Sequence, residues 1–150
     1  MKSTNSDGIT HDTQQKIVID TNVWISTFIS HGVSYKVVDL CITTYKVYCC
    51  TFIIEEIKRN LLEKFKVSKD SVIRVCEFIY KHTSMVEYVK NEVPEICKDL
   101  DDNHILSCCE KCVADWLITG DNELLELKEY KKTKIICPRE FLNLILKQKL

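Results

Sequence analysis

Acidic residues follow directly after apolar runs at two places in the chain. Asp20 comes after the run Ile17–Ile19, and Asp121 follows the segment Trp116–Gly120. Short runs rich in β-branched residues predict buried strands, so both carboxylates are expected where a strand leaves the core. For a single Asp in such a place, the common explanation is a helix cap that accepts from free backbone N–H groups.

Two further groups of acids lie near the start of predicted helices. Asp99, Asp101 and Asp102 cluster at the beginning of one helix, and Glu55 and Glu56 come early in another. Each has an ordinary explanation as a cap, as solvated charge, or as an i, i+4 ion pair such as that of Glu55 with Arg59. Several carboxylates crowded together, however, raise one another's proton affinity unless a cation neutralises them.

The chemistry that such a set of acids favours is metal-dependent phosphoryl transfer. Ligands that are all oxygen favour Mg²⁺ or Mn²⁺ over zinc, and bound metal can activate water and stabilise a leaving oxygen. The sequence has no G-x-x-x-x-G-K-[ST] loop and no G-x-S-x-G elbow, and Asn22 stands where a dehalogenase-type phosphatase needs a second Asp. The four histidines show no ligand spacing, and His104 is predicted to be exposed or to cap a helix.

The elements that must position these acids alternate between strands and helices. Predicted strands are Lys16–Ile19, Tyr45–Cys50, Met85–Val89, Trp116–Ile118 and Lys134–Cys137. Predicted helices are Val23–Ser30, Tyr35–Thr44, Ile53–Phe65, Ser71–His82, Asp101–Val113, Asn122–Leu127 and Arg139–Leu146. This alternation predicts an α/β fold of three layers, with a central parallel sheet of about five strands between helices. Ligands bind at the carboxyl ends of such strands, where the acids are expected to meet.

Length and composition limit the alternatives. The 150 residues, 45% apolar and 29% charged, suit one globular domain over residues 16–150. A net charge of −1 provides no global field for nucleic acid or an anionic membrane, although a local basic face is compatible with it. Residues 1–15 are polar and predict a disordered tail without a signal peptide, and Lys90–Lys98 predicts an exposed loop. No apolar run reaches the roughly 18 to 20 residues of a membrane span. Many cysteines without a signal peptide lead us to expect a cytoplasmic location.

The nine cysteines are predicted to be reduced thiols. Cys109 and Cys112 form the only C-x-x-C pair, and no second pair completes a zinc site. Both fall on one apolar helix face with Ile105, which favours small buried hydrophobes over metal or redox chemistry.

Four stretches resemble the PIN domain family in their order and separations. They are IDTNVWIS, FIIEEIKRNLLEKF, DLDDNHILSCCEKCVADWLITGDNELLEL and KIICPREFL, and the resemblance covers about Lys16 to Leu146. The likeness is greatest to the branch of VapC-like ribonucleases that are toxins of type II toxin–antitoxin systems. It implies a doubly wound α/β fold and an endoribonuclease that depends on Mg²⁺ or Mn²⁺.

The resemblance also implies a set of site residues. The catalytic, metal-ligating acids would be Asp20, Glu56, Asp102 and Asp121, supported by Thr21, Asn22 and Thr119, with Asp99 and Asp101 as outer acids. Helical geometry alone does not separate Asp101 from Asp102, and the register of the motif selects Asp102. Val113 stands where relatives tend to have glycine, which leaves room for a different turn at that helix end.

The expected partners follow from the same resemblance. RNA is the expected substrate, and Lys58, Arg59, Lys64, Lys66 and the lysines of Lys128–Lys134 are candidates to contact its phosphates, although solvated helix faces explain them equally well. A toxin would have a cognate antitoxin that inserts a helix or strand near the acids, and a homodimer is possible. A housekeeping RNA-processing nuclease and a non-catalytic RNA-binding regulator stay open as alternatives.

Overall fold

The computed structural model describes residues 14–88 and 93–148. The predicted tail therefore lies outside the described residues, except for its last two positions. The strands are β1 (Lys16–Ile19), β2 (Lys46–Cys50), β3 (Ser84–Val86), β4 (Trp116–Ile118), β5 (Glu129–Tyr130) and β6 (Thr133–Ile136). The helices are α1 (Thr21–Ile29), α2 (Val33–Thr44), α3 (Thr51–Glu63), α4 (Lys69–His82), α5 (Leu100–Cys112), α6 (Asn122–Leu127) and α7 (Pro138–Gln148).

The strands form one sheet in the order β3-β2-β1-β4-β6-β5. Strand β1 lies between β2 and β4, and every pairing is parallel except that of β5 with β6. The side chains of Ile17, Val18 and Ile19 are completely buried, because the central strand is covered on both faces. The predicted α/β fold with a mostly parallel sheet is thus confirmed.

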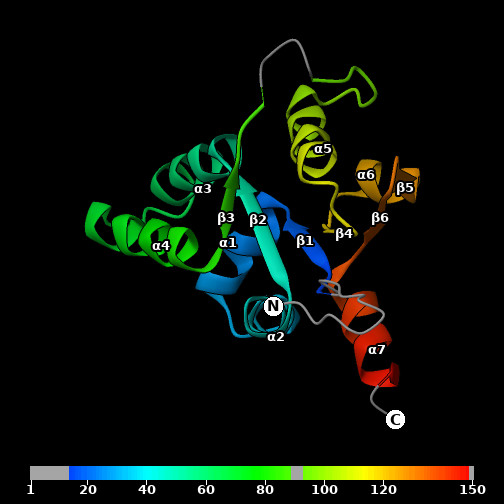
Figure 1. The fold of residues 1–150 in the computed structure, drawn as a ribbon. Helices are drawn as coiled ribbons and strands as arrows, with labels where there is room; N and C mark the ends of the chain where they lie inside the picture. The colour runs from blue at the N-terminus through cyan, green and yellow to red at the C-terminus, as the bar shows by residue number, and fades with distance from the viewer. Residues whose placement is uncertain (1–13, 89–92, 149–150) are drawn as a thin grey trace.

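Helices flank this sheet on its two sides (Figure 1). Helix α1 packs against α2 and α3, α3 packs against α4, and α7 packs against α2. Helix α5 packs against β1, β2 and β3. Because β1, β2 and β4 run parallel, their carboxyl ends meet at one edge, where α1, α3 and the segment before α6 begin.

The structure differs from the predicted elements in a few places. The sheet has a sixth strand, β5, whose two residues are too few to show an alternating pattern. Helix α1 begins at Thr21 rather than Val23, because Asp20 caps it. Strand β3 ends at Val86, whereas the predicted strand extended to Val89, which lies outside the described residues. The described part of the predicted loop Lys90–Lys98 forms no regular element, but its Cys97 is buried.

The nine cysteines are all free thiols, and eight of them are buried. Cys109 and Cys112 belong to the core, as their helical spacing predicted. In the part of the chain that the structure describes, no helix combines the length and apolarity needed to cross a bilayer.

Candidate acidic active site

Asp20 lies at the end of the central strand and joins three elements. Its backbone N–H donates to the carbonyl of Ile118 in β4 at 2.9 Å. Its Oδ1 accepts from the backbone N–H of Thr21 at 2.7 Å and caps α1, and its Oδ2 accepts from Thr119 Oγ1 at 2.6 Å. With only 6% of its surface exposed, this carboxylate is a helix cap and also part of a buried polar group.

Thr119 connects Asp20 to Asp121. The Thr119 side chain is completely buried, and its Oγ1 also accepts from the backbone N–H of Asp121 at 3.0 Å. Asp121 in turn caps α6, since its Oδ1 accepts from the N–H groups of Glu123 and Leu124 at 2.8 and 3.2 Å. One hydroxyl thus fixes the spacing of two acids that are 101 residues apart.

The first turn of α5 brings a third acid to this edge. Asp99 caps the helix by accepting from the backbone N–H of Asp101 at 3.0 Å. Asp102 is 7% exposed, whereas Asp101 is exposed. The buried Asp102 Oδ2 has no hydrogen-bond partner among the described residues. Burial therefore separates the two acids that helical geometry alone left equivalent.

Glu56 on α3 completes the group. Its Oε1 accepts from Thr21 Oγ1 at 3.0 Å, and its Oε2 lies 3.4 Å from Arg59 Nη2. The partner of Arg59 is thus Glu56 and not Glu55, which pairs with Lys58 at 3.4 Å. The side chain of Glu56 also hydrogen-bonds Asp101, so α3 and α5 meet through two carboxyl groups.

The electrostatics of the group are those of crowded, poorly solvated carboxyls. Burial, reinforced by repulsion from Asp121 and Asp99, raises the pKa of Asp102 to about 7. Burial and the hydrogen bond with Asp101 raise the pKa of Glu56 to about 7. Burial also raises the pKa of Asp20, although the hydrogen bonds from Thr119 and Thr21 oppose that shift. The folded chain therefore holds these acids against their mutual repulsion.

Comparison with known proteins identifies the family. The family model of the PIN domain matches residues 16–123. The chain belongs to the PIN domain family. It is also similar to the uncharacterized protein MJ1680 of Methanocaldococcus jannaschii, with 30% identity over 140 residues, which cover 85% of this chain and 90% of that protein. PIN domains are generally nucleases, and they typically use divalent metals.

Two solved structures are similar to this PIN domain to different degrees. VapBC2 from Rickettsia felis, bound to a DNA fragment from its promoter, matches with a TM-score of 0.59 and 12% identity over 82% of this chain and 98% of that chain. FitAB bound to a DNA fragment matches with a TM-score of 0.45 and 16% identity over 81% of this chain and 94% of that chain. At 12% identity, the match to VapBC2 supports the architecture alone.

The predicted supporting and basic residues of this PIN domain differ from one another in burial and in their contacts. Thr21 is buried and bonded to Glu56, whereas Asn22 is exposed on the first turn of α1. Among the basic candidates, Lys58 and Arg59 pair with acids of their own helix, and Lys131 pairs with Glu110 at 2.9 Å. Lys64 forms the C-cap of α3. These contacts fit the solvated-face explanation for Lys58 and Lys131, while Arg59 stands beside Glu56 itself.

His104 is neither fully exposed nor a helix cap, so that prediction was wrong. Its ring stacks on Phe52 with a centroid distance of 4.3 Å and an angle of 9°. Its Nδ1 lies 2.8 Å from Tyr88 Oη. The error has a simple cause, because a ring at the second turn of a helix is placed by tertiary contacts that the local sequence does not contain.

Two residues that the sequence did not point to also shape the acidic edge. Asn103 is buried, and its Oδ1 accepts from the backbone N–H groups of Ile96 and Cys97 at 3.1 and 2.8 Å. Glu123 accepts from the backbone N–H of Lys98 at 2.7 Å. Both therefore tie the segment before α5 to the elements that carry Asp102 and Asp121. The only sequence feature that could have predicted the role of Asn103 and Glu123 is that they lie close to Asp102 and Asp121 in the chain.

The residues present are compatible with a divalent cation. Among residues 14–88 and 93–148, no three His, Cys, Asp or Glu side chains already stand as a ligand set for a metal ion. The donors at this edge are nonetheless all carboxylate oxygens, and the buried Asp102 Oδ2 lacks a partner in the described chain. A buried acceptor in that condition is costly unless something outside the chain satisfies it.

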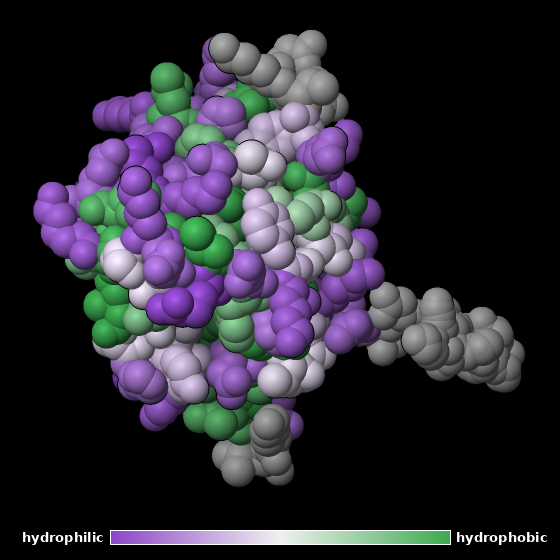
Figure 2. Space-filling view, turned by 90° about the vertical axis from the view of Figure 1, so that its left-hand side faces the viewer, coloured by the Kyte–Doolittle hydropathy of each residue, from purple (hydrophilic) through white to green (hydrophobic). Residues whose placement is uncertain are grey.

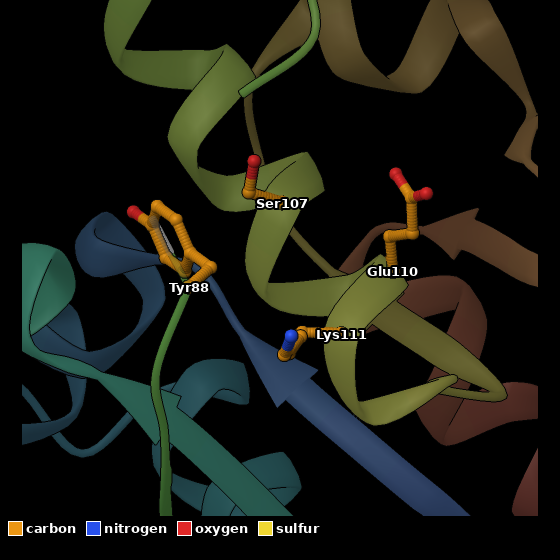
Figure 3. Close-up of a pocket in the computed structure, with 4 residues that line it drawn as sticks. All are labelled: Tyr88, Ser107, Glu110 and Lys111. Carbon is orange, nitrogen blue, oxygen red and sulfur yellow. The ribbon is translucent and has the colours of Figure 1, made fainter. Parts of the chain in front are cut away.

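A separate cavity of about 350 Å³ lies beside α5 and contains none of the predicted acids. It is lined by Tyr88, Ser107, Glu110 and Lys111. Figure 3 shows Tyr88 beside α5, while Glu110 points away from Tyr88. Glu110 bonds Tyr130 and Lys131 instead, at 2.9 Å each. Its lining therefore has no convergent group of acids of the kind found at the carboxyl edge of the sheet.

Proposed function

We propose that this PIN domain is a Mg²⁺- or Mn²⁺-dependent endoribonuclease that acts through Asp20, Glu56, Asp102 and Asp121. One observation carries the proposal: acids from four separate parts of the sequence share one sheet edge, where burial raises the pKa values of Asp20, Glu56 and Asp102. Such an arrangement lowers stability, and a bound cation would offset that cost. The family-level nuclease activity of PIN domains supports the same conclusion.

In the proposed reaction, the chain positions its carboxylates before substrate arrives. Thr119 and the N–H of Thr21 hold the two oxygens of Asp20, and the hydroxyl of Thr21 holds Glu56. A divalent cation bound here would lower the pKa of a coordinated water and stabilise the leaving oxygen. Arg59, beside Glu56, supplies a positive charge near the edge where an RNA phosphate would approach.

The test replaces Asp20 by Asn in purified protein and measures cleavage of single-stranded RNA with Mg²⁺ or Mn²⁺. Asn retains the capping oxygen, so the variant should fold while its cleavage rate falls at least about 100-fold. Asp39→Asn, an exposed acid of α2, is the matched control and should cleave normally. Equal cleavage by both variants would contradict the assignment. Metal-independent RNA binding without cleavage would favour a non-catalytic regulator.

We also propose that the chain is the toxin of a toxin–antitoxin pair. The motif resemblance and the fold shared with VapBC2 support this role. A groove of about 420 Å³ between α3 and α4 offers a partner surface. The exposed apolar residues Leu62, Ile73 and Tyr80 line it, with Lys58, Lys69 and Glu77. On this side of the molecule, hydrophobic patches interrupt the hydrophilic surface (Figure 2).

The role is tested by expressing wild-type chain and Asp20→Asn in growing cells. A toxin should arrest growth only in its wild-type form, and the product of a neighbouring gene should restore growth. An antitoxin that uses the groove should bind Ile73→Glu less tightly than wild type. Normal growth with an active ribonuclease would favour a housekeeping enzyme instead.

A further inference from the structure

We propose that a second cavity next to the acids is a subsite for one unstacked RNA base, beside the phosphate that is cleaved. The cavity measures about 470 Å³ and is lined by Thr51, Phe52, Val86, Glu87, Tyr88 and His104. This inference rests on the proposed ribonuclease function, and it adds a substrate-binding site that the acid constellation does not itself provide.

The cavity contains a fixed aromatic surface. The rings of Phe52 and His104 lie almost parallel, at 9° and 4.3 Å between centroids. Tyr88 Oη lies 2.8 Å from His104 Nδ1 and fixes the rotation of the imidazole. All three rings are only partly buried, so they are not simply part of the core. The two rings cover one face of each other, and an outer ring face that borders the cavity suits the π-face of a base.

The aromatic surface and the acids lie on the same two helices. On α3, Phe52 and Glu56 are four residues apart and share one face. On α5, Asp101 and His104 are three residues apart and also share a face. Phe52 stacks on His104, and Glu56 hydrogen-bonds Asp101. The aromatic contact and the acidic contact are therefore about one helical turn apart, roughly 5–6 Å, so one nucleotide can reach both.

The rim of the cavity supplies polar groups for the edge of a base. The exposed Thr51 hydroxyl can donate or accept, and the exposed Glu87 carboxylate can accept from amino or imino N–H groups of a base. A base inside a duplex would not expose its face to these rings. The chemistry thus selects single-stranded RNA, in which bases can leave the stack.

The experiment measures the binding of a labelled single-stranded RNA octamer by fluorescence anisotropy in EDTA, which prevents metal-dependent cleavage. A ribose-phosphate chain of equal length without bases is the comparison probe. Wild-type protein should bind RNA at least about tenfold more tightly than the base-free chain, since stacking on aromatic side chains typically contributes about that factor or more per base. Equal affinity for the two probes would overturn the proposal.

Substitutions show which side chain is responsible for the preference for RNA over the base-free chain. His104→Ala should reduce the preference for RNA about tenfold, while His104→Phe, which keeps a flat ring, should retain it. Tyr35→Ala removes an exposed aromatic residue of α2 and should leave the preference unchanged. Thermal unfolding of each variant checks that the fold is intact. If His104→Ala keeps the full preference, or if Tyr35→Ala loses it, the base binds elsewhere and the proposal is wrong.

Different experimental results would contradict the ribonuclease proposal and the base-subsite proposal. A base preference that depends on His104, in a protein that cleaves no RNA with any divalent metal, would support the subsite and contradict the ribonuclease. Metal-dependent cleavage with identical affinity for RNA and the base-free chain would support the ribonuclease and overturn the subsite.

Discussion

Two threonine hydroxyls arrange the acids at the scale of single residues. Thr119 donates to Asp20 and accepts from the N–H of Asp121, and Thr21 donates to Glu56. Each hydroxyl thus links two elements that are far apart in sequence. Such supporting bonds determine how precisely ligands are oriented, and their loss commonly costs 10–100-fold in metal affinity or activity.

The variant Thr119→Val tests how much the Thr119 hydroxyl contributes to RNA cleavage, by positioning Asp20, and how much it contributes to the stability of the fold. Valine keeps the shape of threonine but leaves Asp20 Oδ2 without its donor and the N–H of Asp121 without its acceptor. We expect RNA cleavage to fall at least about tenfold and the free energy of unfolding to fall by about 1–3 kcal/mol. Steady-state kinetics and urea unfolding measure the two effects. Thr119→Ser keeps the hydroxyl, so a Ser variant as impaired as the Val variant would refute the role of this oxygen.

The sequence pattern predicted that acids lie at strand ends and helix starts, but not how their neighbours contact them. Asp20 and Asp121 were predictable because each follows an apolar run that can only be a buried strand. The burial of Asp102 rather than Asp101 depended on motif register, since both lie in the first turn of α5. The pairing of Arg59 with Glu56 and the stacking of His104 on Phe52 depend on side-chain rotation and on the approach of α3 to α5. Local sequence patterns predict neither of these two contacts.

Helix α5 shows how one element is fixed at both ends. Asp99 caps its start, and the segment before it is held by Asn103. Its C-cap is Val113, which has a left-handed backbone conformation with φ of 54° and is 49% exposed. This conformation is costly for a β-branched residue. A glycine at this position would adopt it without strain.

Val113→Gly should therefore stabilise the fold. Relief of left-handed strain contributes about 1–2 kcal/mol, partly offset by the greater freedom of glycine in the unfolded chain. We expect a net gain of about 1 kcal/mol, measured by urea unfolding. Val113→Ala removes the branching but keeps a Cβ, so its gain should be smaller. A loss of stability in the glycine variant would show that the exposed valine side chain makes a contact worth more than the strain.

Asn103→Ala tests the other end of α5. The substitution leaves the buried N–H group of Cys97 and the partly buried N–H group of Ile96 without an acceptor. A buried unsatisfied group costs about 1–3 kcal/mol, so we expect a loss of at least about 2 kcal/mol by urea unfolding. Asn122→Ala, at an exposed position of α6, should change stability by less than about 0.5 kcal/mol. Equal effects of the two changes would contradict a special role for Asn103.

At the scale of the whole molecule, the parallel sheet sets the location of the site. Strands β1, β2 and β4 end at the same edge, so the acids gather there although the chain carries a net charge of only −1. The alternation of strands and helices was enough to predict this topology. The short antiparallel β5 was not predictable, because its two residues are held by pairing with β6 and not by their own pattern.

The crowded acids make the stability of the whole domain depend on pH and on metal. The pKa values of Asp102 and Glu56 are raised from 3.8 and 4.5 to about 7, so the folded chain binds their protons more tightly than the unfolded chain does. Their contribution to stability is thus fully present below about pH 4 and is lost as the pH rises through about 7.

In EDTA, the Tm followed by circular dichroism should therefore be several degrees higher at pH 5.5 than at pH 8, because repulsion among ionised carboxylates grows over that interval. Mg²⁺ binds the ionised form, so it should raise the Tm at pH 8 and have little effect at pH 5.5.

Asp102→Asn removes one of the repelling charges, so it should raise the Tm at pH 8 in EDTA and weaken the response to Mg²⁺. Asp39→Asn, which changes the same net charge far from the edge, should retain both dependences. If it changed the pH dependence as much as Asp102→Asn does, net charge rather than the acidic edge would control stability.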